Sequence, residues 1–322
     1  MTDISVLPLK APNQPRLEGP GSRIGSRIGS RSGEHPSTVI SRTRPWYPLY
    51  NCDTPTFIHP SIGTAPLNDL TFYEFPLNER VRLFIRLEQL FHQFDHFMRG
   101  RTVWDCRAVV DTLIDIVGVF TRNDLKSEAL QEIDRQTAVL NRMAKLYEGV
   151  NQDKLTEVVG RLEELSRELY SVPGKLGAPL MENELFKGIV QRSAMPGGSC
   201  SFDLPAYHHW LEGDETARRA DLEHWIEPFL KTRLAIEILL NFIRTSATPT
   251  TELATAGFFQ KSLDHSLAFQ LLRVAIPRTA PYYAEVSGGK HRFTIRFMIR
   301  DPDLRPTQTH EDVEFLLTAC LF

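Results

Sequence analysis

The chain has 322 residues, 42% of them hydrophobic, with 37 Lys and Arg against 40 Asp and Glu. This length predicts a substantial core and two domains, and the formal net charge of −3 argues against a general nucleic-acid binder. Short apolar runs predict neither a transmembrane helix nor a signal peptide, and four widely spaced cysteines predict no disulfide or structural zinc. We therefore expect a reduced cytoplasmic protein without membrane insertion.

Residues 1–70 differ in composition from the rest of the chain. They hold much of the proline and glycine, include the repeat Ser22-Arg-Ile-Gly-Ser-Arg-Ile-Gly-Ser-Arg31, and lack apolar periodicity. Such a segment buries too little apolar surface to offset the entropy of ordering. The sequence predicts a disordered extension, interpreted as dispensable, although its arginines could alternatively steer anionic partners.

From residue 71 to about residue 250 the pattern is mainly helical. The first predicted helix has an apolar stripe from Phe84 to Met98, and a capping box at Thr102 predicts the start of the second. Asp124 and Asn151 are expected to cap two long helices, and Asp214 to begin another. These signals predict an antiparallel helical domain.

After Pro249 the apolar period changes to two, which predicts a β domain over residues 251–322. Segments near residues 71–75 and 200–203 are expected to add strands to its sheet. The fold class is therefore predicted as α+β, with helices and strands segregated. The candidate strands are Gly257–Leu263, Phe269–Ile276, Tyr282–Val286, Arg292–Ile299 and Val313–Thr318.

Two arginines lie side by side on the first predicted helix. Arg82 and Arg86 are one turn apart on a face away from the apolar stripe, and like charges at this spacing cost about 0.2–0.5 kcal/mol in an isolated helix. Glu79 can reach Arg82, but Arg86 has no acidic residue one turn away. This face is either a solvated polar surface or a contact for an anionic partner.

A second basic stripe follows the predicted strand at residues 292–299. Its apolar residues alternate with Arg292, Thr294 and Arg296, and Lys290 precedes them. The planar guanidinium of arginine suits carboxylates because it donates two parallel hydrogen bonds. The stripe is either an ordinary charged solvent face or a second surface for an acidic partner.

The segment around residues 191–211 contains Cys200 eight residues before His208, together with a Pro-Gly-Gly turn. A hydrolase using Cys200 and His208 is one hypothesis, but the segment matches no cysteine-protease pattern. A metal site that also used Asp203 and His209 would need unusual ligand spacing. The sequence favours a structural turn and a capped helix that presents a histidine beside the basic patch.

Four motifs in the same order resemble the ZapD family of bacterial cell-division proteins, from about Thr71 to the C-terminus. The first seventy residues are not part of this resemblance, and Phe75 stands where the family commonly carries histidine. The motifs are Tyr73-Glu-x-Pro-Leu-Asn-Glu-Arg80 through Arg86-Leu-Glu88, Leu125-Lys-Ser-Glu128 with Glu132-x-Asp-Arg-Gln136, Pro196-Gly-Gly-Ser-Cys-Ser-Phe-Asp-Leu-Pro205 with His208-x-Trp210, and Ser287-Gly-x-Lys290 with Arg292-Phe-x-Ile-Arg-Phe-Met298.

The resemblance implies a helical domain plus a β domain in a two-fold homodimer. It implies a non-enzymatic activity at the mid-cell division ring: binding the C-terminal tail peptide of the tubulin-like protein FtsZ and cross-linking its filaments. No cofactor, metal or small-molecule substrate is implied. The residues carried over to the tail-binding surface, expected as a basic groove between the first helix and the sheet, are Arg82, Arg86, His208, Arg292 and Arg296. The residues added on charge alone are Arg122, Lys290 and Arg192.

The main alternative uses the same arginines for a different partner. A nucleic-acid-binding module would contact phosphates and show a steep dependence of affinity on salt, with little preference for a particular peptide. The two hypotheses share their residues, so the sequence separates them only through the family resemblance and the slightly acidic net charge.

Overall fold

The structure is a computed structural model that describes residues 69–146, 152–171, 174, 176–264, 266–289 and 291–321, and describes only the backbone of 143–146 and 152–155. The chain divides into two units, Met1–His59 and Pro60–Phe322, and every described residue belongs to the second. The disorder predicted for residues 1–70 therefore falls almost entirely outside the described part.

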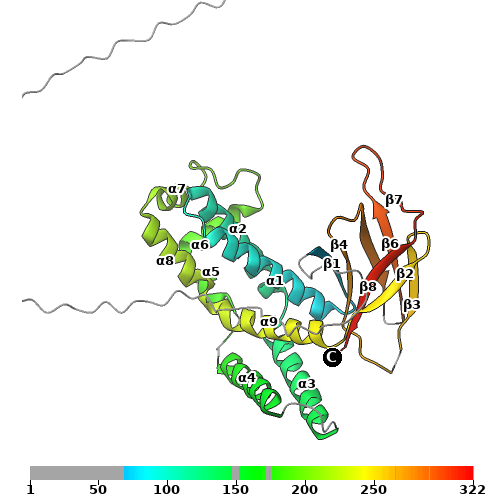
Figure 1. The fold of residues 1–322 in the computed structure, drawn as a ribbon. Coiled ribbons are helices and arrows are strands. Elements are labelled where there is room, and N and C mark those ends of the chain that lie inside the picture. The colour runs from blue at the N-terminus through cyan, green and yellow to red at the C-terminus, as the bar shows by residue number, and fades with distance from the viewer. Residues whose placement is uncertain are drawn as a thin grey trace, which may run out of the picture. The chain divides into compact units, whose positions relative to one another are not determined.

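Helices fill the described chain between the first and second strands (Figure 1). Helices α1 and α2 form an antiparallel hairpin, on which α8 and α9 pack. The predicted capping box is present at Thr102, and the apolar stripe of α1 is buried. The helices are α1 (Glu79–Met98), α2 (Val103–Arg122), α3 (Leu125–Leu146), α4 (Gln152–Ser171), α5 (Ala178–Glu182), α6 (Glu184–Ser193), α7 (Pro205–Glu212), α8 (Glu215–Ile226) and α9 (Leu230–Thr245).

The strands form two antiparallel sheets, one ordered β1-β4-β8-β2 and the other β3-β6-β5 with β7 beside β6. Together with the segregated helices they confirm the predicted α+β class. The strands are β1 (Leu70–Pro76), β2 (Thr250–Ala254), β3 (Phe258–Ser262), β4 (Leu271–Pro277), β5 (Tyr282–Gly288), β6 (Arg292–Ile299), β7 (Thr307–Gln308) and β8 (Val313–Cys320).

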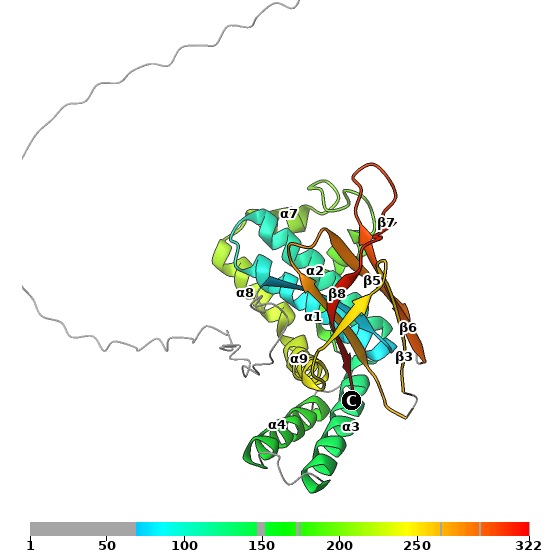
Figure 2. The same ribbon diagram turned by 45° about the vertical axis from the view of Figure 1, so that its right-hand side comes forward.

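The two sheets pack face to face around an apolar core. Phe315 of the first sheet contacts Phe297 of the second, with ring centroids 5.1 Å apart. Leu271 and Cys320, on the opposite face of the first sheet, are buried in the core of the helices. The first sheet therefore lies between the helices and the second sheet, as Figures 1 and 2 also show.

A cluster of ion pairs joins the helices to the first sheet. Arg244 of α9 bonds both Glu74 of β1, at 2.8 Å, and Glu88 of α1, at 2.6 Å. Arg273 of β4 bonds the same Glu74 carboxylate at 2.9 Å. The four side chains are only 14–22% exposed, so this cluster fixes the positions of α1 and α9 against the first sheet.

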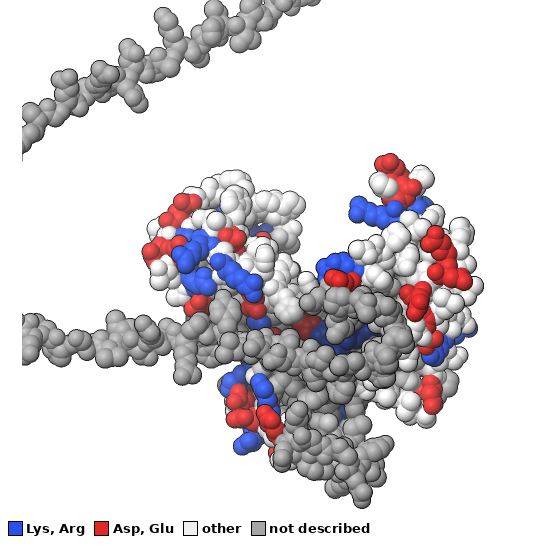
Figure 3. Space-filling view, in the orientation of Figure 1, with Lys and Arg blue, Asp and Glu red and all other residues white. Residues whose placement is uncertain are grey.

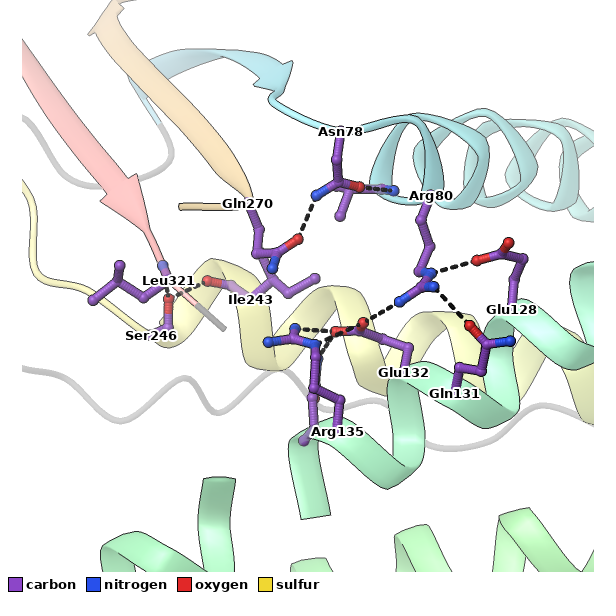
Figure 4. A network of polar contacts seen from close by, with 12 residues as sticks. Asn78, Arg80, Glu128, Gln131, Glu132, Arg135, Ile243, Ser246, Gln270 and Leu321 are labelled. Atoms are coloured by element: carbon purple, nitrogen blue, oxygen red, sulfur yellow. Dashed lines mark hydrogen bonds and ion pairs between the residues drawn. The ribbon is translucent and has the colours of Figure 1, made fainter. Parts of the chain in front are cut away.

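A second polar network ties α1 to α3 (Figure 4). Arg80 donates to Glu128 at 2.5 Å and to Glu132 at 3.0 Å, and the Glu132 side chain is 2% exposed. At the start of α1, the Asn78 side chain accepts from Val81 N at 2.9 Å. These bonds fix the first turn of α1, which carries Arg82, one turn before Arg86.

The prediction of a strand near residues 200–203 is wrong. This segment forms consecutive turns, in which Cys200 O accepts from the backbone N–H of Asp203 at 3.1 Å and of Leu204 at 2.9 Å. The turns bring the chain directly into α7, whose first residue is Pro205, so no extended stretch is left to pair with a sheet.

Candidate partner-binding site

Several partly buried arginines bond carboxylates that belong to other elements. Arg80, Arg233 and Arg244 each connect two or more helices or strands in this way. In contrast, Arg86 and the arginines of β6 are exposed, and within the described residues no hydrogen bond or ion pair reaches their guanidinium groups. These free guanidiniums are available to an anionic partner.

On α1, the two predicted arginines differ in their surroundings. Arg82 Nε bonds Glu79 Oε2 at 3.1 Å, the pairing that the sequence suggested, and its side chain is 38% exposed. Arg86 lies one turn further along and is exposed. The helix therefore presents one neutralised and one free cation, and Arg86 is the stronger candidate for a contact with a carboxylate.

On β6, the predicted alternation is present. Phe293, Ile295 and Phe297 are buried in the core between the sheets, and Arg292 and Arg296 are exposed on the outer face of the second sheet. Residues paired across strands point to the same face of a sheet. The pairing of β6 with β3 and β5 therefore identifies the residues that lie beside these arginines on the outer face.

Phe258 of β3 and Glu285 of β5 stand directly opposite Arg296. Phe258 is 38% exposed, so an apolar contact adjoins the free cation. The Glu285 carboxylate accepts from the Tyr283 hydroxyl at 3.3 Å and makes no ion pair with Arg296. The sequence could not reveal these neighbours because they depend on strand register. Lys290, predicted at the head of the stripe, lies outside the described residues.

The remaining predicted residues are spread over the helices. Arg192 of α6 bonds Asp203 at 2.7 Å and so has a partner within the chain. His208 of α7 is exposed, as is Arg122 at the end of α2. Arg122 lines a pocket together with Tyr170, at the junction of α2 and α3.

One chain does not bring the predicted residues into a single groove. Arg292 and Arg296 face away from the helices, because the first sheet and the core between the sheets intervene. His208 is also distant from Arg82, since α7 packs near the start of α2, beside the end of α1. The sixteen helical steps from Arg82 to Met98 alone span about 24 Å. The expected groove with α1 and β6 as its two walls is therefore corrected to separate basic surfaces.

The segment with Cys200 supports neither the metal nor the nucleophile interpretation. Cys200 is exposed, and no hydrogen bond joins it to His208. In the part of the chain that the structure describes, no three His, Cys, Asp or Glu residues gather as metal ligands would. Among the described helices, none is long and apolar enough to cross a membrane.

Comparison with known proteins gives one consistent family. A ZapD family model, described as cell division protein, matches residues 85–296. A protein of Methylococcus capsulatus named cell division protein ZapD is 51% identical over 249 residues, 77% of this chain and 97% of that protein. Proteins of the same name from Azoarcus sp. and Nitrosomonas eutropha are 39% and 38% identical, each over 77% of this chain and 98% of the relative. The chain therefore belongs to the ZapD family, and its role is in cell division.

Proposed function

We propose that this protein binds the carboxylate-bearing C-terminal tail of FtsZ and, as a homodimer in the cytoplasm, cross-links FtsZ filaments at the mid-cell division ring without catalysing a reaction. The observation that carries the proposal is the contrast between paired and free arginines. Among the described residues, carboxylates bond the arginines that join the elements, but none bonds Arg86, Arg292 or Arg296.

The separation of the basic surfaces shapes the proposed mechanism. The surface on α1 and the surface on β6 contact different tails, or distant parts of one tail. Each contact is weak, because exposed ion pairs contribute about 0–1 kcal/mol and are screened over about 8–10 Å at physiological salt. Two chains facing many tails along a filament raise the apparent affinity by about 10²–10⁴ through effective concentration. Weak contacts combined in this way give reversible bundles.

Co-sedimentation with FtsZ filaments tests the proposal. We expect the wild type to bundle full-length filaments but not filaments lacking the tail, and we expect Arg86→Glu and Arg296→Glu to lose bundling. Arg161→Glu on α4 is the matched control, since Arg161 is also exposed and the substitution makes the same change in charge. Unfolding in urea checks that each variant remains folded.

The same assay can exclude the proposal. Bundling that survives removal of the FtsZ tail, or that is unchanged in both Arg86→Glu and Arg296→Glu, would show that these surfaces do not bind the tail. Parallel titrations with a labelled tail peptide and a labelled oligonucleotide distinguish the proposal from the nucleic-acid alternative. That alternative requires tight binding of the oligonucleotide and no binding of the peptide.

A further inference from the structure

The helices cover only one end of the first sheet. Leu271 and Cys320 lie at that end and are buried in the core of the helices. The next row along the strands holds the ion pair of Arg273 with Glu74. Beyond this row, the apolar side chains on the same face belong neither to the core of the helices nor to the core between the sheets.

Strand register identifies the residues of this uncovered part. Residues that stand opposite each other on neighbouring strands point to the same face of a sheet. The pairs of β1 with β4, of β4 with β8 and of β8 with β2 therefore give two rows across the sheet. We call the apolar residues of these two rows the open face: Leu70, Phe72, Leu253, Ala275, Pro277 and Leu316.

The open face is exposed and nearly uncharged. Leu253 is 56% exposed and Phe72 is 41% exposed, although the Arg273 guanidinium carbon lies 4.7 Å from the centre of the Phe72 ring. Of the side chains in the two rows, only Glu314 is charged. Figure 3 shows charged residues on the visible side of the sheets in separate groups, with mainly uncharged surface between them. A solvated sheet face normally carries polar residues, so an apolar face of this kind calls for an apolar cover.

The chain enters the first sheet at the edge of the open face. Asp69 directly precedes β1, and its carbonyl oxygen accepts from the backbone N–H of Arg278 at 2.7 Å, which fixes the point of entry beside Leu70. The division of the chain between His59 and Pro60 places residues 60–68 in the same unit as the sheets. These nine residues are therefore the nearest part of the chain that can cover the open face.

The composition of residues 60–68 matches that of the open face. The segment reads Pro-Ser-Ile-Gly-Thr-Ala-Pro-Leu-Asn and contains no Lys, Arg, Asp or Glu, and Ile62 and Leu67 are its large apolar residues. The seven Lys and Arg that precede β1 all lie at or before Arg44. A carboxylate-bearing peptide suits the open face poorly, because its two rows offer no basic side chain.

The segment is long enough to cross the open face. Three strand spacings of about 4.8 Å separate β1 from β2, so the face is about 14 Å wide. An extended chain advances about 3.3 Å per residue, so Leu67 can reach about 7 Å from Asp69 and Ile62 about 23 Å. A short tether also gives the segment an effective concentration in the millimolar range, which favours it over a separate molecule.

We propose that residues 60–68 pack on the open face, with Leu67 beside Phe72 and Ile62 beside Leu253. This contact gives the first sheet an apolar cover on both faces, since the helices and residues 60–68 then share the side opposite the second sheet. It also makes the last nine residues before Asp69 a part of the folded domain. The contact lies within one chain and does not depend on the binding of FtsZ.

Hydroxyl-radical footprinting of the full chain, read by mass spectrometry, tests the proposal through the accessibility of side chains. We expect Ile62 and Leu67 to be labelled at least about threefold more slowly than Leu304, which is 73% exposed in the loop between β6 and β7. We expect Ile62→Asp to raise the labelling of Leu253 at least about twofold, because an aspartate does not pack on an apolar face. Reciprocally, Leu253→Thr should raise the labelling of Ile62.

Matched controls separate loss of the contact from loss of the fold. Ser61→Asp makes the same change in charge beside Ile62 and should leave the labelling of Leu253 as in the wild type. Leu304→Thr removes an exposed leucine outside the open face and should leave that of Ile62 unchanged. Urea unfolding checks that each variant remains folded.

Three results would overturn the proposal. The first is labelling of Ile62 and Leu67 as fast as that of Leu304, or labelling of Leu253 that is unchanged in Ile62→Asp. The second is labelling of Leu253 that rises when the wild type is diluted, which would assign the open face to a second copy of the chain. The third is protection of Leu253 only when the FtsZ tail peptide is added, which would assign the face to that peptide.

Discussion

Replacing Arg244 with methionine removes the residue that joins the helices to the first sheet. The guanidinium bonds Glu74 with both Nε and Nη2 at 2.8 Å and bonds Glu88 at 2.6 and 2.7 Å. Methionine retains much of the apolar stem, which limits the loss of packing. Glu88 then has no cation within the cluster, whereas Glu74 keeps Arg273 at 2.9 Å.

The expected loss of stability follows from these contacts. Removing one partner of a fully buried pair costs about 3–5 kcal/mol, because it leaves a charge without compensation. The carboxylates here are 17% and 14% exposed, and one keeps a partner, so water and Arg273 relieve part of the cost. We expect the free energy of unfolding of Arg244→Met to fall by about 2–4 kcal/mol at neutral pH.

The loss should depend on pH in a defined direction. Burial alone would raise the pKa of Glu74, but hydrogen bonds and charge from Arg244, and then from Arg273, lower it below 4.5. A lowered pKa contributes stability that is present above the unfolded-state pKa and is lost as the pH falls through the folded-state pKa. Without Arg244 most of this contribution is absent. The deficit of the variant is therefore largest near neutral pH and shrinks as the pH falls below 4.5.

Urea unfolding followed by circular dichroism measures this effect, since urea adds no ions that screen charges. Arg161→Met, an exposed position on α4, is the matched control and should change the free energy of unfolding by less than about 0.5 kcal/mol. A deficit below about 1 kcal/mol for Arg244→Met, or one that stays constant on acidification, would refute the assignment of the cluster as the joint.

Three further outcomes are expected. Thr102→Ala should lower the free energy of unfolding by about 0.5–2 kcal/mol in urea melts, because Asp105 N loses its acceptor, whereas Thr102→Ser should retain it. Arg80→Met should cost about 1–3 kcal/mol in the same melts through the loss of its bonds to α3, and an unchanged midpoint would contradict that role. In a double-mutant cycle on tail-peptide affinity, Arg86→Ala and Arg296→Ala should couple by less than about 0.5 kcal/mol, and coupling above about 1 kcal/mol would place them in one groove.

Local periodicity predicted the elements that have one buried face. The apolar stripe of α1 and the alternation of β6 can be predicted because each pattern depends only on residues two to four positions apart in the sequence. The capping box at Thr102 is equally local. By contrast, β2 and β7 were not predicted, since β2 exposes most of its residues and β7 has only two. Short or exposed strands leave little periodic signal.

Pairing between distant segments was less accessible from sequence. The placement of β1 beside β4 was partly foreseen, because residues 71–75 were expected to join the sheet, but the division of the strands into two sheets was not. The strand expected at residues 200–203 shows the same limit. Its apolar and polar residues alternate as in a strand, yet hydrogen bonds to Cys200 O close the segment into turns.

The candidate site shows how composition and topology contribute differently to function. The sequence identifies Arg86 because no acidic residue lies one turn away, and identifies Arg292 and Arg296 by the alternation of their strand and the family resemblance. The structure shows no ion pair for any of the three within the described chain. Their assembly into one groove did not follow, because sequence spacing carries no information on which face of a sheet meets the helices. Once Leu271 and Cys320 bury one face of the first sheet against the helices, β6 must expose its arginines on the opposite side of the molecule. A partner that engages both surfaces must therefore be long, repeated or contacted by two copies of the chain, and a filament with many tails meets all three conditions.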